Sequence, residues 1–570
     1  METRSTKSEI RNKFQIQNPK HVQNRHASGV FLIFDLWICF GFRISDFAIW
    51  MMSNRYAVAM AVIPFTTMPF TTAAAQSDAP INLGSRRELF VDKVLVDRLS
   101  GRAEQRLHAP QPQEISITHD APWEGSGCGY HSIFQDGDLY RMYYKAWHLD
   151  VSGGKLKSDS HPLFLCYAES RDGIRWTKPE LGLVEFNGSK LNNIVMAPGM
   201  FAEVNADPGH TAVFRDENPA AGANARYKAI VHSSKPRGLL AFQSADGLRW
   251  SPISDKPVIT DGAFDSQNLA FWDAARGEYR AYWRYFTAGI IDDKNWKPSG
   301  HRAIRTARSK DFLNWVDQRD LSYPDVPSEQ LYTNQIKPYH RAPHILVGFP
   351  TRYVDRGWSE SMRSLPELEH RQARSSANQR YGTAITEGLF MSSRDGVNFN
   401  RWHEAFLRPG IERVGKWHYG DQYIGWHLVE TKSPLDGAPS ELSLYSTESY
   451  WTGNSSLLRR YSLRMDGFVS IHAPMSGGEL LTKPFTFTGK QLSLNFSSSA
   501  AGTLRVELQT AAGQPVAGFT LDECDEIFGD SLDRKVSWKS NVDVSSFQGK
   551  PVRMRIELRD ADLFAFQFSH

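Results

Sequence analysis

The sequence has few of the residues that hold small or metal-stabilised folds together. Four cysteines among 570 residues exclude a disulfide scaffold, and the absence of a Cys-x-x-Cys pair gives no indication of a zinc ribbon. Neither sign of charge dominates, because 66 Lys and Arg stand against 63 Asp and Glu. A nucleic-acid-binding protein would carry a clustered basic excess. No nucleic-acid partner is therefore expected.

Several short motifs that signal known chemistry are also missing. There is no Gly-x-Ser-x-Gly elbow, no phosphate loop, no His-Glu-x-x-His pair and no dinucleotide fingerprint after a strand. His340 and His344 stand four residues apart, but Pro343 disfavours the helix that a metal pair at this spacing needs. We assign no metal ligand and expect no cofactor, while loop carboxylates leave a structural calcium ion open.

Turn-forming and aromatic residues are plentiful instead. The chain has 42 Gly and 29 Pro, which mark turns, and 33 Phe, 20 Tyr and 16 Trp, which favour strands. After residue 75 no segment shows long helical periodicity. Because 570 residues exceed one compact core, we expect an all-β chain of two or three domains.

Residues 1–75 have the character of a leader. Within them, 51–75 combine a basic start at Arg55, a short apolar stretch and an Ala-x-Ala end, which are the parts of a secretory signal peptide. Charged residues interrupt the apolar run at 31–50 and disfavour a membrane-spanning helix. We expect 1–50 to be a start-site error, with a cytoplasmic extension and membrane anchor as the alternative. A periplasmic or secreted protein without stable membrane insertion after signal removal is expected.

Three cysteines follow the leader. An oxidising compartment permits one disulfide bond, and Cys128 with Cys166 is the expected pair, since both fall in the first repeat described below. The alternative is that these two and Cys524 are all unpaired and buried.

A seven-residue motif recurs along the middle of the chain. Ser-x-Asp-Gly-x-x-Trp begins at Ser170 and Ser244, variants begin at Ser309 and Ser393, and a degenerate fifth copy begins at Ser446. Ser and Asp hydrogen-bond a tight turn, Gly supplies a positive φ, and the aromatic residue packs beneath. Each copy follows hairpin-like apolar alternation. The five units predict a β-propeller with five blades of up to four strands.

Regions on either side of the repeats differ from them. The propeller is expected over 128–474, and 76–127 form an N-terminal arm that packs on or closes the ring. Beyond Pro474 the motif disappears, and 475–570 alternate at period two, which predicts a β-sandwich. The sequence carries no signal for an oligomeric state.

A five-bladed propeller with these turns, preceded by a signal-like leader and followed by a sandwich, resembles the invertase, levansucrase and arabinanase-like glycoside hydrolases. It is similar above all to planctomycete-type proteins labelled glycosyl hydrolase, family 32-like. The resemblance covers 86–570 at the level of architecture and repeats. It implies hydrolysis of an oligo- or polysaccharide by three acids at the starts of the innermost strands of blades one, two and three.

Only part of that pattern stands in this sequence. The blade-one position falls on Tyr130 and His131, and the nearest acids before it include Glu124. The blade-two position falls on His210, after Asp207. A carboxylate lies close only at blade three, and the Asn-Asp-Pro-Asn stretch of invertases is absent. A non-catalytic glycan-binding propeller and an envelope structural protein therefore stay open as alternatives.

Acids near strand starts or pocket-forming loops are the candidate catalytic residues: Asp265, Asp421, Glu124 and Glu387. Each has a structural alternative, such as capping a turn. Polar residues expected at the axis are candidate substrate-binding residues, because His, Asn and Gln both donate and accept hydrogen bonds. They are His131, His210, Asn268, Asn334 and Gln335, together with the loop residue Trp123. The alternative is that the polar residues bond to one another and Trp123 anchors its loop.

Overall fold

The computed structural model describes residues 79–570 except 153–154, 159–160 and 292–294. The expected leader, with its start site and signal peptide, lies outside the described residues. In the part of the chain that is described, no helix is both long and apolar enough to cross a membrane.

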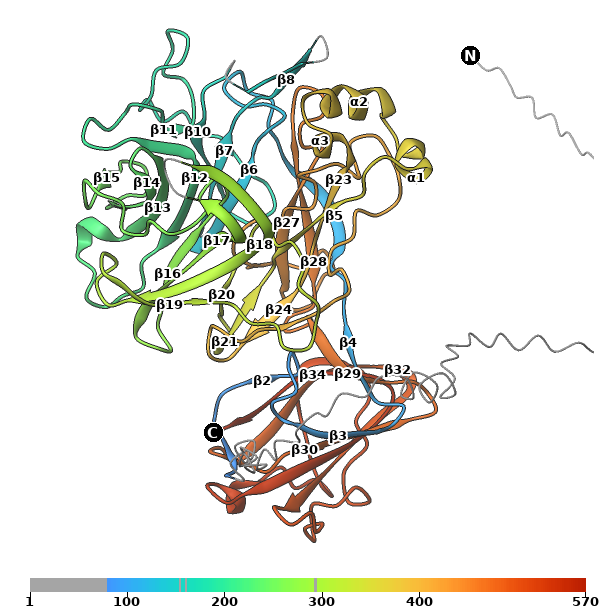
Figure 1. The fold of residues 1–570 in the computed structure, drawn as a ribbon. Coiled ribbons are helices and arrows are strands. Elements are labelled where there is room, and N and C mark those ends of the chain that lie inside the picture. The colour runs from blue at the N-terminus through green and yellow to red at the C-terminus, as the bar shows by residue number, and fades with distance from the viewer. Residues whose placement is uncertain (1–78, 153–154, 159–160, 292–294) are drawn as a thin grey trace, which may run out of the picture. The chain divides into compact units, whose positions relative to one another are not determined.

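Five four-stranded antiparallel sheets form the blades of a propeller, which confirms the predicted all-β, five-bladed fold (Figure 1). Blade one contains β6 (Gly129–Asp136), β7 (Leu139–Ala146), β10 (Phe164–Ser170) and β11 (Ile194–Met196). Blade two contains β12 (Ala206–Arg215), β13 (Tyr227–Ser234), β14 (Arg237–Ser244) and β15 (Ser251–Pro252). Blade three contains β16 (Leu269–Asp273), β17 (Glu278–Ile291), β18 (Trp296–Ser309) and β19 (Trp315–Asp320).

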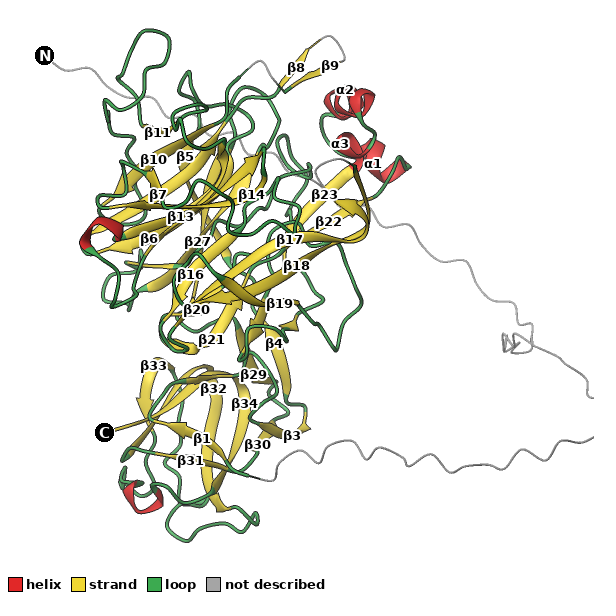
Figure 2. Ribbon diagram, turned by 60° about the vertical axis from the view of Figure 1, so that its left-hand side comes forward, coloured by secondary structure: helices red, strands yellow, loops and turns green. Residues whose placement is uncertain are grey.

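The last two blades have additions. Blade four contains β20 (Lys337–Tyr339), β21 (Ala342–Gly348), β24 (Met391–Ser393) and β25 (Asn400–Arg401). A second hairpin branches from it, made of β22 (Thr351–Asp355) and β23 (Ala384–Gly388), with α1 (Glu360–Ser364), α2 (Leu368–Ala377) and α3 (Arg380–Thr383) between its strands (Figure 2). Blade five contains β26 (Val429–Thr431), β27 (Glu441–Glu448), β28 (Leu457–Leu463) and β5 (Gln111–Thr118). A small hairpin, β8 (Asp150–Ser152) and β9 (Lys155–Lys157), extends from blade one.

The repeated motif forms the turn that follows the third strand of blades one to four. Ser170 Oγ accepts the N–H of Gly173 at 2.9 Å, and Asp172 accepts the N–H of Ile174 at 2.8 Å. Gly173 has a φ of +70°, a conformation that glycine adopts at little cost. Equivalent bonds recur in the copies that begin at Ser244, Ser309 and Ser393.

The expected fifth copy is not such a turn. Ser446 lies inside β27, the second strand of blade five, and pairs with Arg459. The fourth strand of this blade is β5, which pairs with β28 from the other end of the propeller sequence. Because β5 arrives from the N-terminal side, the chain makes no turn from the third to the fourth strand here. The motif that encodes this turn is therefore degenerate in the sequence.

A ten-stranded sheet lies outside the propeller in the described part of the chain, and the expected N-terminal arm contributes to it. Its N-terminal strands are β1 (Ile81–Gly84), β2 (Glu88–Leu89), β3 (Val96–Gly101) and β4 (Glu104–Leu107). Its C-terminal strands are β29 (Val469–Ala473), β30 (Gly478–Thr482), β31 (Phe485–Phe487), β32 (Gln491–Thr510), β33 (Asp530–Lys535) and β34 (Val552–Ser569). The two long strands, β32 and β34, pair along their length with bulges, and both halves of each supply side chains to one core. Within the expected arm, residues 76–127, β5 is the strand that closes the ring by pairing with β28.

The three cysteines of the described residues are free and buried. The expected disulfide between Cys128 and Cys166 is therefore not formed, and the alternative of three unpaired thiols holds. Burial raises the pKa of Cys128 to about 12 and that of Cys524 to about 11. Thiols with raised pKa values are poor nucleophiles at neutral pH, so these three side chains act as packing residues.

Asp466 joins the propeller to the ten-stranded sheet. Its carboxylate is fully buried, and it accepts the Tyr339 hydroxyl at 2.7 Å and the Arg341 guanidinium at 2.9 Å, both from blade four. From the sheet it accepts Arg87 at 3.3 Å and the Asn495 amide at 3.0 Å. A buried charge with this many partners is costly to disturb, because removing it leaves the cations unpaired.

We expect Asp466→Ala to lower the free energy of unfolding by about 3–5 kcal/mol, the usual cost of removing one member of a buried ion pair. The measurement is chemical denaturation followed by tryptophan fluorescence. Asp97→Ala is the control, because Asp97 pairs with Arg553 at 2.6 Å but is 38% exposed. It should cost less than about 1 kcal/mol. Equal losses in the two variants would contradict the assignment of Asp466 as the joining residue.

Candidate active site at one end of the propeller axis

Five tyrosines gather where the chain enters the innermost strands. The Tyr332 ring lies 5.5 Å from the Tyr423 ring, which lies 6.1 Å from that of Tyr130. The Tyr419 hydroxyl donates to the Tyr332 hydroxyl at 2.9 Å, and the Tyr450 ring lies tilted, 6.0 Å from that of Tyr423. All five are buried, and burial raises the pKa of four of them. Burial would also raise the pKa of Tyr332, but the charge of Arg284 outweighs it and the pKa is lowered. They give this end of the axis an aromatic floor with polar edges.

Two buried cations are set into this aromatic floor. Lys145 Nζ donates to the Tyr450 hydroxyl at 2.9 Å and lies 4.7 Å from the centre of the Tyr130 ring. Burial lowers the pKa of Lys145 to about 8. The Arg284 guanidinium, from the second strand of blade three, lies 4.7 Å from the centre of the Tyr332 ring. Both cations are attracted to the negative faces of the rings.

Asp265 has a solvent-exposed carboxylate at this end of the axis. It stands in the turn before β16 and accepts a hydrogen bond from Arg284. The Asp265 side chain is 61% exposed, whereas that of Arg284 is 3% exposed. The surrounding protein would raise the pKa of Asp265, but the charges of Arg284, His210 and His232 together hold it below its ordinary value. The structure therefore places an ionised carboxylate, held by a buried cation, where it meets solvent.

A second acid shares its carboxylate between two imidazoles. Asp207 Oδ2 lies 2.7 Å from Nδ1 of His210 and 3.1 Å from Nδ1 of His232. Asp207 in β12 pairs with His232 in β13, and the register shifts immediately after Asp207, so that His210 lies in a bulge. Such bulges re-aim side chains next to functional sites. Burial would raise the pKa of Asp207, but the two histidines hold it well below its usual range.

These two groups belong to one site. The His210 ring lies 5.6 Å from that of Tyr130, and the His232 ring lies 6.5 Å from that of Phe264, the residue before Asp265. The site thus combines an ionised carboxylate, a carboxylate–imidazole cluster and an aromatic floor. Of the predicted site residues, it contains Asp265 and His210.

The other predicted acids lie elsewhere. Asp421 is fully buried, and its two oxygens accept backbone N–H groups of His418 at 3.0 Å and Tyr450 at 3.1 Å. With both oxygens occupied by backbone donors, Asp421 braces the chain before blade five instead of facing a ligand. Burial raises its pKa to about 7.

Glu124 and Glu387 are held in ion pairs. Glu124 is buried between the Tyr144 hydroxyl at 2.5 Å and Lys178 Nζ at 2.6 Å, which leaves it no access to a substrate. Glu387 in β23 accepts two hydrogen bonds from Arg352, at 2.7 and 2.8 Å. Glu387 also lines an open cavity of about 460 Å³ beside Trp417, on the branched hairpin and apart from the tyrosine cluster.

Most of the polar residues expected at the axis bond to the protein itself. Gln335 Nε2 donates to Gln267 Oε1 at 2.8 Å and to the Ile424 carbonyl at 3.0 Å. Gln267 in turn donates to the Tyr130 carbonyl at 2.8 Å and to Ser132 Oγ at 3.1 Å. These amides cross the axis and tie the blades together, which is the structural alternative that the sequence left open.

The remaining predicted binding residues are buried or partly buried in structural contacts. Asn268 donates to two carbonyls of the turn that carries Asp265, at 2.8 and 3.0 Å, and so shapes that turn. Asn334 is buried, His131 Nε2 faces His119 Nε2 at 3.2 Å inside blade one, and Trp123 Nε1 donates to an asparagine at 2.6 Å. None of these four side chains joins the site in the described structure.

Sequence reasoning missed Arg284, His232 and Asp207 as site residues, and also Lys145 and the five tyrosines. Arg284 and His232 lie on second strands: the fold brings Arg284 beside Asp265, which precedes β16, and the register brings His232 opposite Asp207 within β12. The one available signal was the predicted hairpin in blade two: its regular pairing from Ala212 and Ile230 would place His232 opposite His210, and the bulge moves it opposite Asp207.

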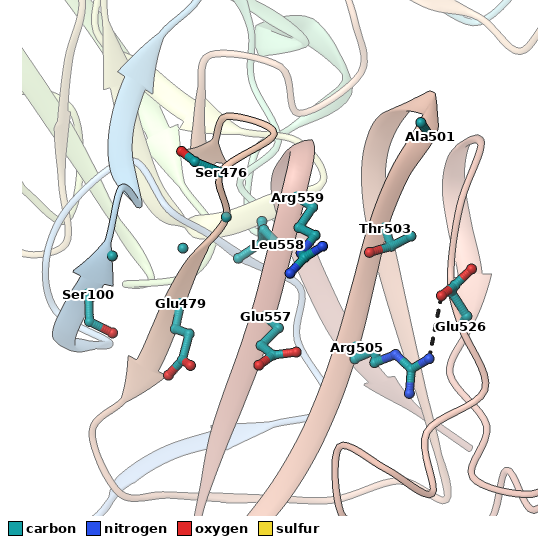
Figure 3. A pocket seen from close by; sticks show the side chains of 13 residues that line it. Ser100, Ser476, Glu479, Ala501, Thr503, Arg505, Glu526, Glu557, Leu558 and Arg559 are labelled. Carbon is teal, nitrogen blue, oxygen red and sulfur yellow. Dashed lines mark hydrogen bonds and ion pairs between the residues drawn. The ribbon is translucent and has the colours of Figure 1, made fainter.

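Two other cavities lie away from this site. One of about 550 Å³ opens on the ten-stranded sheet, where Glu479, Glu557 and Arg559 extend from neighbouring strands and Arg505 pairs with Glu526 at 3.4 Å (Figure 3). None of the described residues that line it is aromatic, so it lacks the rings on which sugars stack. The other, of about 440 Å³, lies at the opposite end of the axis and includes Lys337. Both cavities have an exposed carboxylate, Glu526 in the first and Glu430 in the second, but each is paired with a partly exposed cationic or imidazole side chain instead of a buried one.

Comparison with known proteins gives distant structural matches only. No protein-family model matches the chain, and no curated protein matches it. A complex of BT0996 and RGII matches with a TM-score of 0.37 at 14% identity, covering 63% of the present protein and 93% of BT0996. An N-acetylgalactosamine deacetylase from F. plautii, in complex with blood group B trisaccharide, matches with a TM-score of 0.36 at 11% identity, covering 62% and 94%.

A glycosyl hydrolase from Bacteroides ovatus matches with a TM-score of 0.35 at 13% identity, covering 67% of the present protein and 93% of that hydrolase. Similarity at this level does not carry an activity from one protein to another. The function of this chain therefore has to be argued from its own site.

The raised pKa of Asp421 gives a prediction for stability. Its pKa is about 7 in the folded protein and 3.8 as its ordinary value, so between these pH values the folded state holds a proton that the unfolded chain has lost. The stabilisation of the folded state by this proton is complete below 3.8, the pKa in the unfolded chain, and it is lost as the pH rises through 7, the pKa in the folded protein. We expect Asp421→Asn to lose this dependence, with a slope of unfolding free energy between pH 4 and 7 that is less negative by up to about 1.4 kcal/mol per pH unit.

Thermal and urea unfolding at several pH values measure this slope. The exposed Asp138→Asn is the matched control and should follow the wild type. Parallel pH profiles for the wild type and Asp421→Asn would show that Asp421 is ionised in the folded protein throughout this range.

Proposed function

We propose that this chain is a glycoside hydrolase that acts on an oligo- or polysaccharide at the tyrosine-lined end of the propeller axis. The observation that carries the proposal is Asp265, a solvent-facing carboxylate held ionised by the buried Arg284. Glycosidases work with carboxylates that flank the scissile bond and with a proton donor on the other side of it. The leader-like residues before 76 support the further proposal that the protein is exported, where such substrates occur.

The aromatic floor supports binding of a sugar ring. Tyr130, Tyr332 and Tyr423 pack against one another and are 7%, 7% and 4% exposed, so a sugar ring would meet their outer, polar edges. Lys145 and Arg284 are buried in the floor, where they hold the Tyr450 hydroxyl and the Asp265 carboxylate in place. A hydroxyl-rich ligand would thus meet the exposed Asp265 carboxylate above an ordered aromatic floor.

Asp265 is the group that we place at the reacting carbon. Because it is ionised, it serves either as the nucleophile or as the base that activates water, and Arg284 fixes its orientation. The cluster of Asp207, His210 and His232 stands beside it and is placed to exchange the proton of the leaving group. An imidazole held by a carboxylate is a common proton-transfer group near neutral pH.

A non-catalytic glycan-binding propeller is the second candidate. One observation favours it: both carboxylates of the site are already paired, Asp265 with Arg284 and Asp207 with two histidines. A binding protein would use these pairs as fixed hydrogen-bonding groups and would release no product.

The test is product analysis of the purified protein with a broad panel of oligo- and polysaccharides. We expect Asp265→Asn to lower the rate of sugar release by at least about 100-fold, the lower end of what a positioned acid or base contributes. Asp261→Asn is the matched control, because Asp261 lies four residues earlier and also pairs with an arginine, Arg305, at 2.7 Å. It should release sugar at nearly the wild-type rate.

Two results would count against hydrolysis. Full activity in Asp265→Asn would show that Asp265 takes no part in the reaction. Retention of a glycan from the same panel by the wild type, with no sugar released, would support the binding candidate instead.

A further inference from the structure

We propose that Asp207, His210 and His232 form a binding site for one divalent first-row transition-metal ion. One ligand atom from each residue lies within 4.8 Å of the others. This inference goes beyond the proposed function and does not depend on it, because the ion could be bound whether or not the site cleaves sugars. It also revises the expectation from the sequence, which assigned no metal ligand.

The distances between the ligand atoms suit a metal ion. Zn²⁺ and similar ions lie about 2.0–2.1 Å from imidazole nitrogen and carboxylate oxygen. Two such ligands are therefore about 3.3 Å apart around a tetrahedral ion and about 3.0 Å apart at right angles around an octahedral one. Oδ2 of Asp207 lies 2.7 Å from Nδ1 of His210 and 3.1 Å from Nδ1 of His232. An ion can enter with small shifts of the three side chains.

The backbone fixes the direction of the carboxylate. Oδ1 of Asp207 accepts the N–H of Gly209 at 2.9 Å, which leaves Oδ2 directed at the two imidazoles. A Cβ at Gly209 would approach the Leu163 side chain to 2.7 Å, so the position favours glycine. Outer contacts that hold a ligand in place are a regular feature of metal sites.

The imidazoles are oriented as well. The His210 and His232 rings lie 5.6 Å apart in an edge-to-face arrangement, and His210 also packs 5.6 Å from the Tyr130 ring. His232 is fixed opposite Asp207 by the β12–β13 register, and the bulge places His210 beside them. Three ligands from one hairpin therefore converge without any rearrangement of the blade.

The donor set defines the class of ion. Two imidazoles and one carboxylate suit Zn²⁺, Mn²⁺, Fe²⁺, Co²⁺ or Ni²⁺, whereas Ca²⁺ and Mg²⁺ prefer oxygen ligands alone. Three protein ligands leave coordination positions free, as in catalytic metal sites. The His210 side chain is 16% exposed and that of His232 is 12% exposed, so the cluster is reached from the solvent. Water or a sugar hydroxyl would occupy the free positions.

The competing arrangement is a hydrogen-bonded network without metal, in which both imidazoles donate to Asp207. The test uses the purified full chain, stripped with a chelator and titrated with ZnCl₂ by calorimetry, with metal content measured by mass spectrometry. We expect one equivalent of zinc in the wild type. His232→Asn and Asp207→Asn should each weaken binding by more than the roughly 10–100-fold that loss of an outer contact costs.

His340→Asn is the matched control. His340 also faces a carboxylate, with Nε2 2.7 Å from Glu430, but it lies outside the cluster. This variant should bind zinc like the wild type. Circular dichroism of each variant establishes that it is folded, and the visible spectrum of the Co²⁺-loaded wild type gives a second measure of imidazole and carboxylate ligation. That spectrum should change in His232→Asn and remain unchanged in His340→Asn.

Zinc binding below one tenth of an equivalent in the wild type, or equal binding in the folded cluster variants, would overturn the metal site and support the network. Sugar release is measured separately on stripped and zinc-loaded protein. Sugar release by a wild type that takes up no zinc would overturn the metal site alone. Zinc binding without release from any glycan would count against the proposed hydrolysis alone.

Discussion

Pairing of β5 with β28 is the constraint on which the rest of the propeller depends. This pairing closes the ring, since β5 comes from before blade one and completes blade five. Closure makes the innermost strands converge, so that Tyr130, Asp207 and Asp265 from three blades reach one small volume. The same convergence explains why Gln267 and Gln335 span the axis, because each amide reaches the neighbouring inner strands.

The burial of each ion pair then determines which carboxylates can contact a ligand. Lys145 and Arg284 are buried among aromatic rings, where an unpaired cation is costly. Arg284 is compensated by Asp265, whose carboxylate still faces solvent because the cation approaches it from below the surface. Glu124, by contrast, is enclosed with its cation, Lys178. Two similar ion pairs thus serve different purposes, and the difference lies in the exposure of the carboxylate.

Much of the architecture could be predicted from the sequence, because each blade turn has its own local chemistry. The Ser170 turn needs only residues within five positions of one another, so the motif shows it directly. The Ser446 copy failed because its blade is completed by a distant strand, which no local pattern reveals. The same limit applies to the site. The expected position ahead of an inner strand identified Asp265 and His210. The same criterion also selected Asp421, whose two oxygens accept backbone N–H groups.

The remaining site residues depend on a shift of register at a bulge, which the regular alternation of the two strands does not show. His232 becomes a site residue only because β13 pairs with β12 so that it stands opposite Asp207. The bulge after Asp207 then adds His210 without disturbing the pairing that resumes at Ala212. A bulge can therefore place two imidazoles on one carboxylate while the blade keeps its fold. Whatever holds the two rings to Asp207, a proton or a metal ion, the strand pairing brings the three groups together first.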